Sequence, residues 1–364
     1  MAADFATLHQ MVQLARRNLA RGEWDYLAGA AETETTMKRN RLALDRLALR
    51  ARVMNDVSQT HVSRTVLGVD LRIPVMLAPI GSLQVFDPGG GLAAARAAGE
   101  FGVMQILSSV CQPDFESLAR DCDAPKIYQL YLHGPDEAWM MGVIERAVAA
   151  GYKAFCLTAD TQVGSRRERD ILKGYLPLTA RQPGTNLPRK PGPTMQPVMS
   201  WAMVARIRER FDIPIAIKGI ACGEDAELAV KHGVQMVYVS NHGGRQLDQG
   251  EGTMDVLPEV VDAVAGRATV LVDGGIMRGT DVLKALALGA DAVAIGRLEA
   301  LAMAAGGTPG VVRMLELLET EMRLNLALMG LSSIDQLTPR SVVPAQPVVP
   351  PHVLSAFPLL EEDY

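Results

Sequence analysis

The segment from residue 240 to residue 248, Ser-Asn-His-Gly-Gly-Arg-Gln-Leu-Asp, carries residue types that could do chemistry on a small acid. His242 can accept a proton near neutral pH, and Arg245 can bind a carboxylate through two parallel hydrogen bonds. Gly243 and Gly244 between them allow a tight turn and the close approach of a ligand. The segment therefore predicts chemistry on a carboxylate next to a hydroxyl. A glycine-rich turn with solvated polar side chains is the local alternative.

Eight apolar runs, alternating with helical patterns from residue 75 onward, predict the elements that position this segment. Their apolar and β-branched content is typical of parallel strands buried on both faces. Helical patterns such as 136–150, 224–232 and 279–288 lie between them. Eight strand–helix units favour an α/β fold, a single closed (β/α)8 barrel, over an open doubly wound sheet. The predicted strands are Val75–Ile80, Met104–Val110, Lys126–Leu132, Ala154–Asp160, Pro214–Ile220, Met236–His242, Thr269–Gly275 and Ala292–Arg297.

Three segments differ from this repeat. Residues 1–74, with helical patterns at 8–19 and 36–47, predict a helical extension packed on the barrel of residues 75–340. Residues 160–197 form a long proline-containing connection after the fourth strand, which should lie over the active-site face. Residues 341–364 form a proline-rich tail, expected to be extended and either wrapped on a neighbouring subunit or disordered.

Polar or small residues follow all eight predicted strands, where a barrel of this type places its catalytic groups. Lys218 ends an apolar run; it is either a surface lysine or a fixed positive charge facing a ligand. The last two strands end in glycine turns, one of them followed by Arg297, which predicts a phosphate site. The residues at the strand ends are Ala78, Pro79, Ile80, Ser108, Gln129, Tyr131, Thr158, Asp160, Lys218, Ser240, His242, Asp273, Gly274, Gly275, Gly296 and Arg297.

Composition narrows the function classes. Hydrophobic residues make up 48% and charged residues 21% of the 364 residues, which is ordinary for a soluble globular enzyme. A net charge of -5 gives no basic footprint for a nucleic-acid partner. The four cysteines lack metal-ligand spacing, so we expect free thiols and no metal. We also expect no membrane span and no signal peptide, and therefore a cytoplasmic location.

From about residue 24 to residue 331, the sequence resembles the FMN-dependent α-hydroxy acid dehydrogenase/oxidase family. This family includes glycolate oxidase, lactate oxidase, mandelate dehydrogenase and the flavin domain of flavocytochrome b2. Besides residues 240–248, the matching motifs are Trp24-Asp25-Tyr26, Leu77-Ala78-Pro79, Leu107-Ser108-Ser109, Gln129-Leu130-Tyr131, Leu157-Thr158-Ala159-Asp160, Arg166-Arg167-Glu168, Lys218-Gly219 and Gly279-Thr280-Asp281-Val282.

The resemblance implies an enzyme with FMN as cofactor that oxidises an L-2-hydroxy acid to a 2-oxo acid. It makes His242 the base that takes the hydroxyl proton as hydride passes to flavin N5. Asp160 then stabilises the imidazolium. The electrons would pass to oxygen or to a quinone-type acceptor.

The same resemblance assigns the remaining residues to the substrate and to FMN. Arg245 and Arg167 would hold the substrate carboxylate, and Tyr26 and Tyr131 would hydrogen-bond the substrate. Without the family match, Tyr26 could be a packing residue and Arg167 part of a solvated charged run. The FMN contacts would be Ala78, Pro79, Ile80, Ser108, Gln129, Thr158 and Ser240 for the flavin, Lys218 for its N1/O2 edge, Asp273 for the ribityl chain, and Gly274, Gly275, Gly296 and Arg297 for the phosphate.

Three positions depart from the family pattern. Met277 stands where relatives often have a phosphate-binding arginine, which predicts weaker retention of FMN. Val110 stands where glycolate oxidase has a tryptophan, which predicts room for a larger substrate. Gly81 resembles the residue that mandelate dehydrogenase has at this position. This favours a dehydrogenase, with oxygen as the alternative electron acceptor.

Two other functions stay open on the sequence. One is a flavin-binding relative that acts on a different substrate, such as a peptide-derived cofactor. The other is a non-redox barrel enzyme with a phosphorylated substrate, in which Lys218 would be a base or form a Schiff base. By analogy with relatives, we expect a homo-oligomer, either a tetramer or an octamer.

Overall fold

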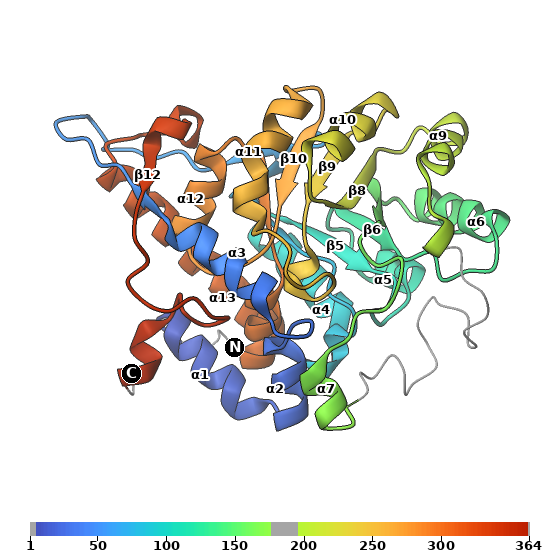
Figure 1. Ribbon diagram of the computed structural model, residues 1–364, viewed down its shortest axis with the longest axis horizontal. Helices are drawn as coiled ribbons and strands as arrows, with labels where there is room; N and C mark the ends of the chain where they lie inside the picture. Colours follow the sequence, from blue (N-terminus) through green and yellow to red (C-terminus); the bar gives the residue numbers. More distant parts are fainter. Residues whose placement is uncertain (1–4, 176–195, 363–364) are drawn as a thin grey trace.

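The structure is a computed structural model that describes residues 5–175 and 196–362 (Figure 1). Eight parallel strands form a closed barrel in the order β10-β11-β4-β5-β6-β7-β8-β9. The predicted (β/α)8 barrel is therefore confirmed. The strands are β4 (Val75–Leu77), β5 (Met104–Ser108), β6 (Lys126–Leu130), β7 (Ala154–Thr158), β8 (Ile215–Ile220), β9 (Met236–Val239), β10 (Thr269–Val272) and β11 (Ala292–Ile295).

Several strands end earlier than predicted, because their polar ends leave the hydrogen-bonded ladder. β9 ends at Val239, and His242 begins the 3₁₀ turn η3 (His242–Gly244). β11 ends at Ile295, and Arg297 begins the long helix α13 (Arg297–Leu328). The polar residues at these ends are thus in loops and helix starts, where the backbone can turn toward a ligand.

The barrel interior is filled by one cluster of apolar side chains from alternate strand positions, including Met76, Met104 and Leu271. Val66 and Leu71 belong to the same cluster. They come from a hairpin of β2 (Arg64–Val66) and β3 (Val69–Leu71). The N-terminal extension was expected to be helical, but this part of it is a β-hairpin that packs against the barrel interior.

Helices surround the barrel (Figure 1). The predicted patterns at 136–150, 224–232 and 279–288 correspond to α6, α10 and α12. Non-helical backbone at Gly306 and Gly307 divides α13 into two helical parts. The surrounding helices are α4 (Gly90–Phe101), α5 (Phe115–Asp121), α6 (Glu137–Ala149), α9 (Trp201–Arg210), α10 (Gly223–Lys231), α11 (Thr253–Val264), α12 (Gly279–Ala287) and α13.

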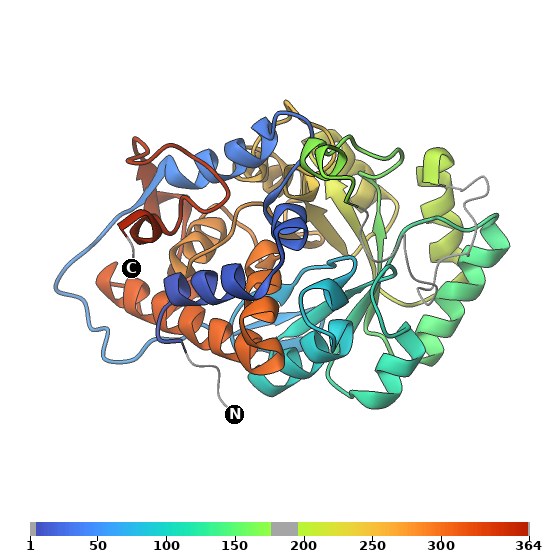
Figure 2. The ribbon, with the colours of Figure 1, turned by 90° about the horizontal axis from the view of Figure 1, so that it is seen from below.

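The N-terminal helices α1 (Leu8–Asn18), α2 (Arg21–Ala28) and α3 (Thr35–Asp45) lie against the barrel, with α1 running along α13 (Figure 2). Arg41 of α3 is buried and donates to Asp281 of α12 at 2.7 Å and to the carbonyl of Gly275 at 3.0 Å. Loss of one partner of such a buried ion pair strongly destabilises the folded protein. The pair therefore fixes α3 beside the strand ends.

The C-terminal tail packs on its own chain. β12 (Val342–Pro344) pairs antiparallel with β1 (Leu47–Leu49). Phe357 is buried and lies 5.5 Å from the ring of His9, between ring centroids. The sequence had suggested a disordered end or one wrapped on a neighbour, and in the structure Phe357 and the β12 pairing hold the tail on the N-terminal segment of the same chain.

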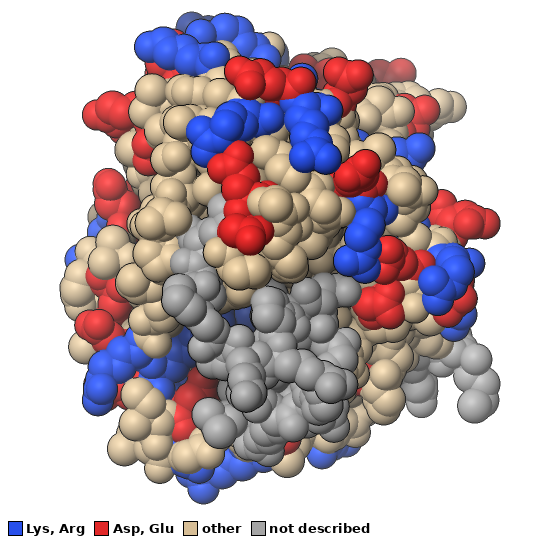
Figure 3. Space-filling model, turned by 90° about the vertical axis from the view of Figure 1, so that its right-hand side faces the viewer, with Lys and Arg blue, Asp and Glu red and all other residues tan. Residues whose placement is uncertain are grey.

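Where Figure 3 draws the described residues, acidic and basic side chains are interspersed, and these residues form no continuous basic surface on this face of the kind that binds nucleic acid. Among the helices that the structure describes, none combines the length and the apolar character that a membrane span needs.

Candidate active site

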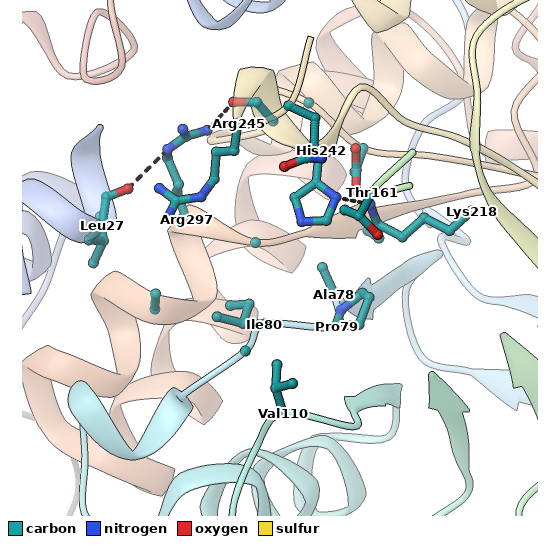
Figure 4. Close-up of a pocket in the computed structure, with 18 of the residues that line it drawn as sticks. Leu27, Ala78, Pro79, Ile80, Val110, Thr161, Lys218, His242, Arg245 and Arg297 are labelled. Carbon is teal, nitrogen blue, oxygen red and sulfur yellow. Dashed lines mark hydrogen bonds between the residues drawn. The ribbon is translucent and has the colours of Figure 1, made fainter. Parts of the chain in front are cut away.

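A cavity of about 390 Å³ lies at the carboxyl ends of the barrel strands. His242, Arg245 and Arg297 lie on one side of it, and Ala78, Ile80 and Val110 lie on the other (Figure 4). Most of the residues that the sequence singled out line this cavity. They are Tyr26, Ala78, Pro79, Ile80, Tyr131, Arg167, Lys218, His242, Arg245, Asp273, Gly274, Gly275, Gly296 and Arg297.

His242 is held in an unusual backbone conformation, with a φ of 58°. A non-glycine residue in this left-handed region carries backbone strain, which the surrounding contacts must hold. Its backbone N–H donates to the hydroxyl of Ser240 at 3.1 Å, and its Nδ1 lies 2.9 Å from Oδ1 of Asp160. The Nε2 atom lies 3.5 Å from the hydroxyl of Tyr131. The ring is therefore fixed between a carboxylate and a phenol.

The surroundings of His242 favour a neutral imidazole. Burial lowers its pKa, the positive charge of Lys218 lowers it further, and Asp160 acts in the opposite direction. Because a carboxylate only accepts, Nδ1 carries the proton toward Asp160 and Nε2 keeps its lone pair. Burial alone would raise the pKa of Asp160, but the charge of Lys218 and the hydrogen bond with His242 outweigh it and lower the pKa to about 2, so the carboxylate is charged. The pair can accept a proton at Nε2 and stabilise the resulting cation.

Lys218 is buried inside the barrel mouth and is not a surface lysine. Its Nζ donates to the Ser240 hydroxyl at 2.9 Å and lies 3.6 Å from Oδ2 of Asp160. Ser240 in turn donates to Asp273 at 2.7 Å. Burial alone would lower the pKa of Lys218, but the carboxylates of Asp160 and Asp273 raise it. The result is a permanent positive charge at the cavity wall.

Gln129 and Thr158 lie fully buried behind the cavity, together with Ser108. Nε2 of Gln129 donates to the Thr158 hydroxyl at 2.8 Å. Oε1 of Gln129 is buried and has no hydrogen-bond partner among the described residues. A buried acceptor without a donor is costly, so this atom suits a ligand N–H.

The two predicted carboxylate-binding arginines both reach the cavity. Nη1 of Arg245 donates to the carbonyls of Tyr26 and Gly29 at 2.6 and 2.8 Å, and its other N–H groups are not used by these contacts. Burial and the nearby Arg167 lower the pKa of Arg245 to about 10, so it stays charged near neutral pH. Arg167 lines the cavity, whereas its neighbour Arg166 is exposed beside Glu168.

The two tyrosines are part of the wall. Tyr26 of α2 stacks with Phe86 at 6.2 Å between ring centroids, and the guanidinium of Arg245 lies 4.8 Å from the centre of its ring. It is therefore both a packing residue and a cavity residue. Burial raises the pKa of Tyr131 to about 12, so its hydroxyl stays protonated beside His242.

The predicted phosphate end of the cavity contains Gly274, Gly275 and Gly296, but the guanidinium of Arg297 is engaged elsewhere. It donates to the carbonyl of Leu27 at 3.1 Å (Figure 4) and to those of Gly243 and Gly29 at 2.8 and 2.9 Å. Burial and the charge of Arg245 lower its pKa to about 9. Met277 is buried at this end and adds no charge. A phosphate role for Arg297 remains a prediction.

The two glycines after His242 lie in close contact with other segments of the chain. A Cβ on Gly244 would lie 2.5 Å from the backbone nitrogen of Met37, and one on Gly243 would lie 2.8 Å from Nη1 of Arg297. Both glycines also have positive φ values. The sequence predicted a tight turn and the close approach of a ligand at these two glycines, and in the structure they also allow the close approach of α3 and of Arg297.

Sequence reasoning missed several residues of the site. His133, Thr161 and Gln246 line the cavity. Gln196 connects the loop after β6 to the end of β7, because it accepts from the Leu132 amide at 2.6 Å and donates to the Thr158 carbonyl at 2.8 Å. Gln246 was visible within the 240–248 motif. The positions of the others depend on loop geometry, which no local pattern gives.

Comparison with known proteins gives consistent matches along nearly the whole chain. Residues 15–344 match the family model described as FMN-dependent dehydrogenase. An L-lactate oxidase of Nostoc sp. is 38% identical over 91% of this chain and 96% of its own length. A peroxisomal (S)-2-hydroxy-acid oxidase of Oryza sativa subsp. japonica is 40% identical over 90% of this chain and 92% of its own. The crystal structure of mandelate oxidase with (S)-2-phenylpropionate has a TM-score of 0.85, is 36% identical, and covers 95% of this chain and 100% of that one.

Proposed function

The chain belongs to the FMN-dependent dehydrogenase family, and from this premise we propose that it oxidises an L-2-hydroxy acid to the 2-oxo acid with His242 as the base. Family membership argues against the non-redox barrel enzyme that the sequence had left open. The observation that carries the proposal is the His242–Asp160 pair, which faces a cavity that also holds Arg245.

The residues present fit a bound FMN. The buried Oε1 of Gln129 lacks a donor, which an N–H of the flavin ring would supply, and Lys218 provides a fixed positive charge for the ring. Asp273 would contact the ribityl chain, and the backbone at Gly275 and Gly296 would hold the phosphate. When bound, FMN supplies a two-electron acceptor for the hydride that leaves the substrate α-carbon.

His242 takes the proton of the substrate hydroxyl at Nε2, the atom that faces the Tyr131 hydroxyl. Asp160 stabilises the positive charge that forms on the ring, because it already accepts from Nδ1. A positioned base of this kind contributes roughly 10²- to 10⁴-fold to the rate.

Arg245 and Arg167 bind the substrate carboxylate and fix the α-carbon relative to the base. The carbonyls of Tyr26 and Gly29 hold Arg245 through one nitrogen and leave its other N–H groups for the substrate. Tyr26 and Tyr131 donate hydrogen bonds to the bound acid.

The relatives named above are all oxidases, which supports oxygen as the electron acceptor. Gly81 alone had favoured another acceptor. However, a Cβ on Gly81 would lie 2.6 Å from Cγ2 of Val110, so the valine occupies the space that the glycine leaves. Mandelate oxidase among the structural relatives supports a substrate larger than glycolate.

The proposal is tested by mixing the FMN-loaded protein without oxygen with glycolate, L-lactate, L-2-hydroxyoctanoate and L-mandelate. We expect one of these acids to bleach the flavin absorbance near roughly 450 nm, and admitted air to restore it. The variant His242→Asn should bind FMN normally but be bleached roughly 10²- to 10⁴-fold more slowly. A flavin that no acid bleaches would contradict the proposal and favour a relative with a different substrate.

A further inference from the structure

His133 is an ionisable cavity residue that the proposed reaction does not use. It follows β6 and lies next to Tyr131, with 5.5 Å between the ring centroids. The ring of Tyr131 also lies 6.4 Å from that of His242, so the same tyrosine contacts both imidazoles. His133 is therefore close to the reacting groups but separate from them.

The ring nitrogens of His133 are available to a ligand. Its backbone N–H donates to the Tyr131 carbonyl at 2.8 Å, but within the described part of the chain neither ring nitrogen has a hydrogen-bond partner. Burial lowers the pKa of His133, so the ring is neutral near neutral pH. A neutral imidazole offers one donor and one acceptor.

The rest of the cavity limits what could bind to this imidazole. Ile80, Phe86 and Val110 form an apolar surface that suits a hydrocarbon or aryl group. The positive charges of Arg167, Arg245 and Lys218 oppose an ammonium group on the substrate. A hydroxyl group is uncharged and, like the neutral imidazole, both donates and accepts.

We propose that His133 is a specificity-determining residue that selects 2-hydroxy acids whose side chain is an aryl ring bearing a hydroxyl group. This inference rests on the proposed function, because it concerns the side-chain end of the same substrate. A site that hydrogen-bonds a substrate hydroxyl discriminates against the analogue that lacks it, since its own polar group is then left unpaired.

The test compares (S)-mandelate with (S)-4-hydroxymandelate in anaerobic flavin reduction. We expect the wild-type protein to prefer the hydroxylated acid by roughly threefold to tenfold in kcat/KM, the effect of one neutral hydrogen bond. His133→Phe keeps a ring beside Tyr131 and should abolish the preference, so that kcat/KM becomes equal for the two acids. His133→Asn keeps a polar group and should retain part of the preference.

A binding measurement gives an independent readout. The non-reacting acids phenylacetate and 4-hydroxyphenylacetate are titrated into the FMN-loaded protein, and Kd is taken from the change in flavin absorbance. Tighter binding of the hydroxylated acid in the wild type, lost in His133→Phe, would support the inference. Equal wild-type kcat/KM for the two mandelates, or equal losses for both in His133→Phe, would overturn it. Bleaching by L-lactate but by neither mandelate would overturn the inference alone, whereas no bleaching by any acid would overturn the proposed function as well.

Discussion

Nδ1 of His242 lies 2.9 Å from Oδ1 of Asp160, although the two residues belong to different strand ends of the barrel. We predict that Asp160→Asn slows flavin reduction by roughly 10²- to 10⁴-fold, because the amide neither fixes the tautomer nor stabilises the imidazolium. Flavin reduction by L-lactate or L-mandelate measures this. The exposed Asp212→Asn serves as the control, and a normal rate in Asp160→Asn would remove Asp160 from the mechanism.

The pH dependence of kcat/KM should report His242. Burial and Lys218 lower the pKa of this imidazole below its usual value of 6.5. The base is active when neutral, so kcat/KM is predicted to be constant near pH 7 and to fall in acid, with a midpoint below 6.5. In Lys218→Met this midpoint should move upward, because a charge that lowers the pKa is lost. A midpoint above 6.5 in the wild type would argue against this assignment.

The adjacent residues Arg166 and Arg167 allow a matched comparison of two substitutions. Arg167 lines the cavity, and the adjacent Arg166 is exposed beside Glu168. We predict that Arg167→Lys raises KM for the 2-hydroxy acid by roughly 10- to 100-fold, the equivalent of one charged hydrogen bond. Arg166→Lys should change KM by less than about twofold. Equal effects of the two substitutions would show that the loop, and not the guanidinium of Arg167, determines binding.

We predict that the residue at position 277 affects the affinity for FMN. Met277 is buried at the phosphate end of the cavity, and Arg297 donates there to backbone carbonyls. Met277→Arg is therefore predicted to tighten FMN binding by roughly tenfold or more, as expected for one charged hydrogen bond. Fluorescence titration of the apoprotein measures Kd, with riboflavin as the control ligand because it lacks the phosphate. An equal gain for riboflavin would contradict a phosphate contact.

Glu299 makes stability depend on pH. It is fully buried in the first turn of α13, and no partner for its carboxyl oxygens lies in the described ranges. Burial raises its pKa well above 4.5. The folded protein keeps it protonated while the unfolded chain ionises, so this contribution to stability is lost as pH rises above 4.5.

Glu299→Gln removes this dependence. Relative to the wild type, its unfolding free energy should therefore gain up to about 1.4 kcal/mol per pH unit above pH 4.5, until the pKa of the folded state is reached. Urea denaturation at pH 5, 7 and 9 measures the difference, with the exposed Glu100→Gln as the control. A difference that does not vary with pH would mean that Glu299 is already ionised.

The sequence predicted the barrel and most of the cavity, because both depend on local patterns. Apolar runs with turn signals located the strands, and polar residues at their ends located His242, Asp160 and Lys218. The exact strand ends were less predictable, since a residue such as His242 leaves the ladder for a strained turn that only tertiary contacts hold.

What the sequence could not show were contacts between distant segments. The Gly244 position is determined by the backbone of Met37 in α3, and the tail by the packing of Phe357 on His9. The hydrogen bonds of Arg297 to three backbone carbonyls are a further contact of this kind. Such contacts depend on the folded arrangement and leave no periodic signal.

Arg297 donates to three backbone carbonyls and Arg245 donates to two. These bonds determine whether the N-terminal extension can fold independently of the barrel. The carbonyls of Tyr26, Leu27 and Gly29 accept four of these five bonds, and the carbonyl of Gly243 accepts one. A barrel cut free before residue 75 would lose four of these five hydrogen bonds to charged groups, which is destabilising. We therefore expect the extension and the barrel to unfold together, with the backbone amides of α2 and η3 exchanging their hydrogens in the same opening event.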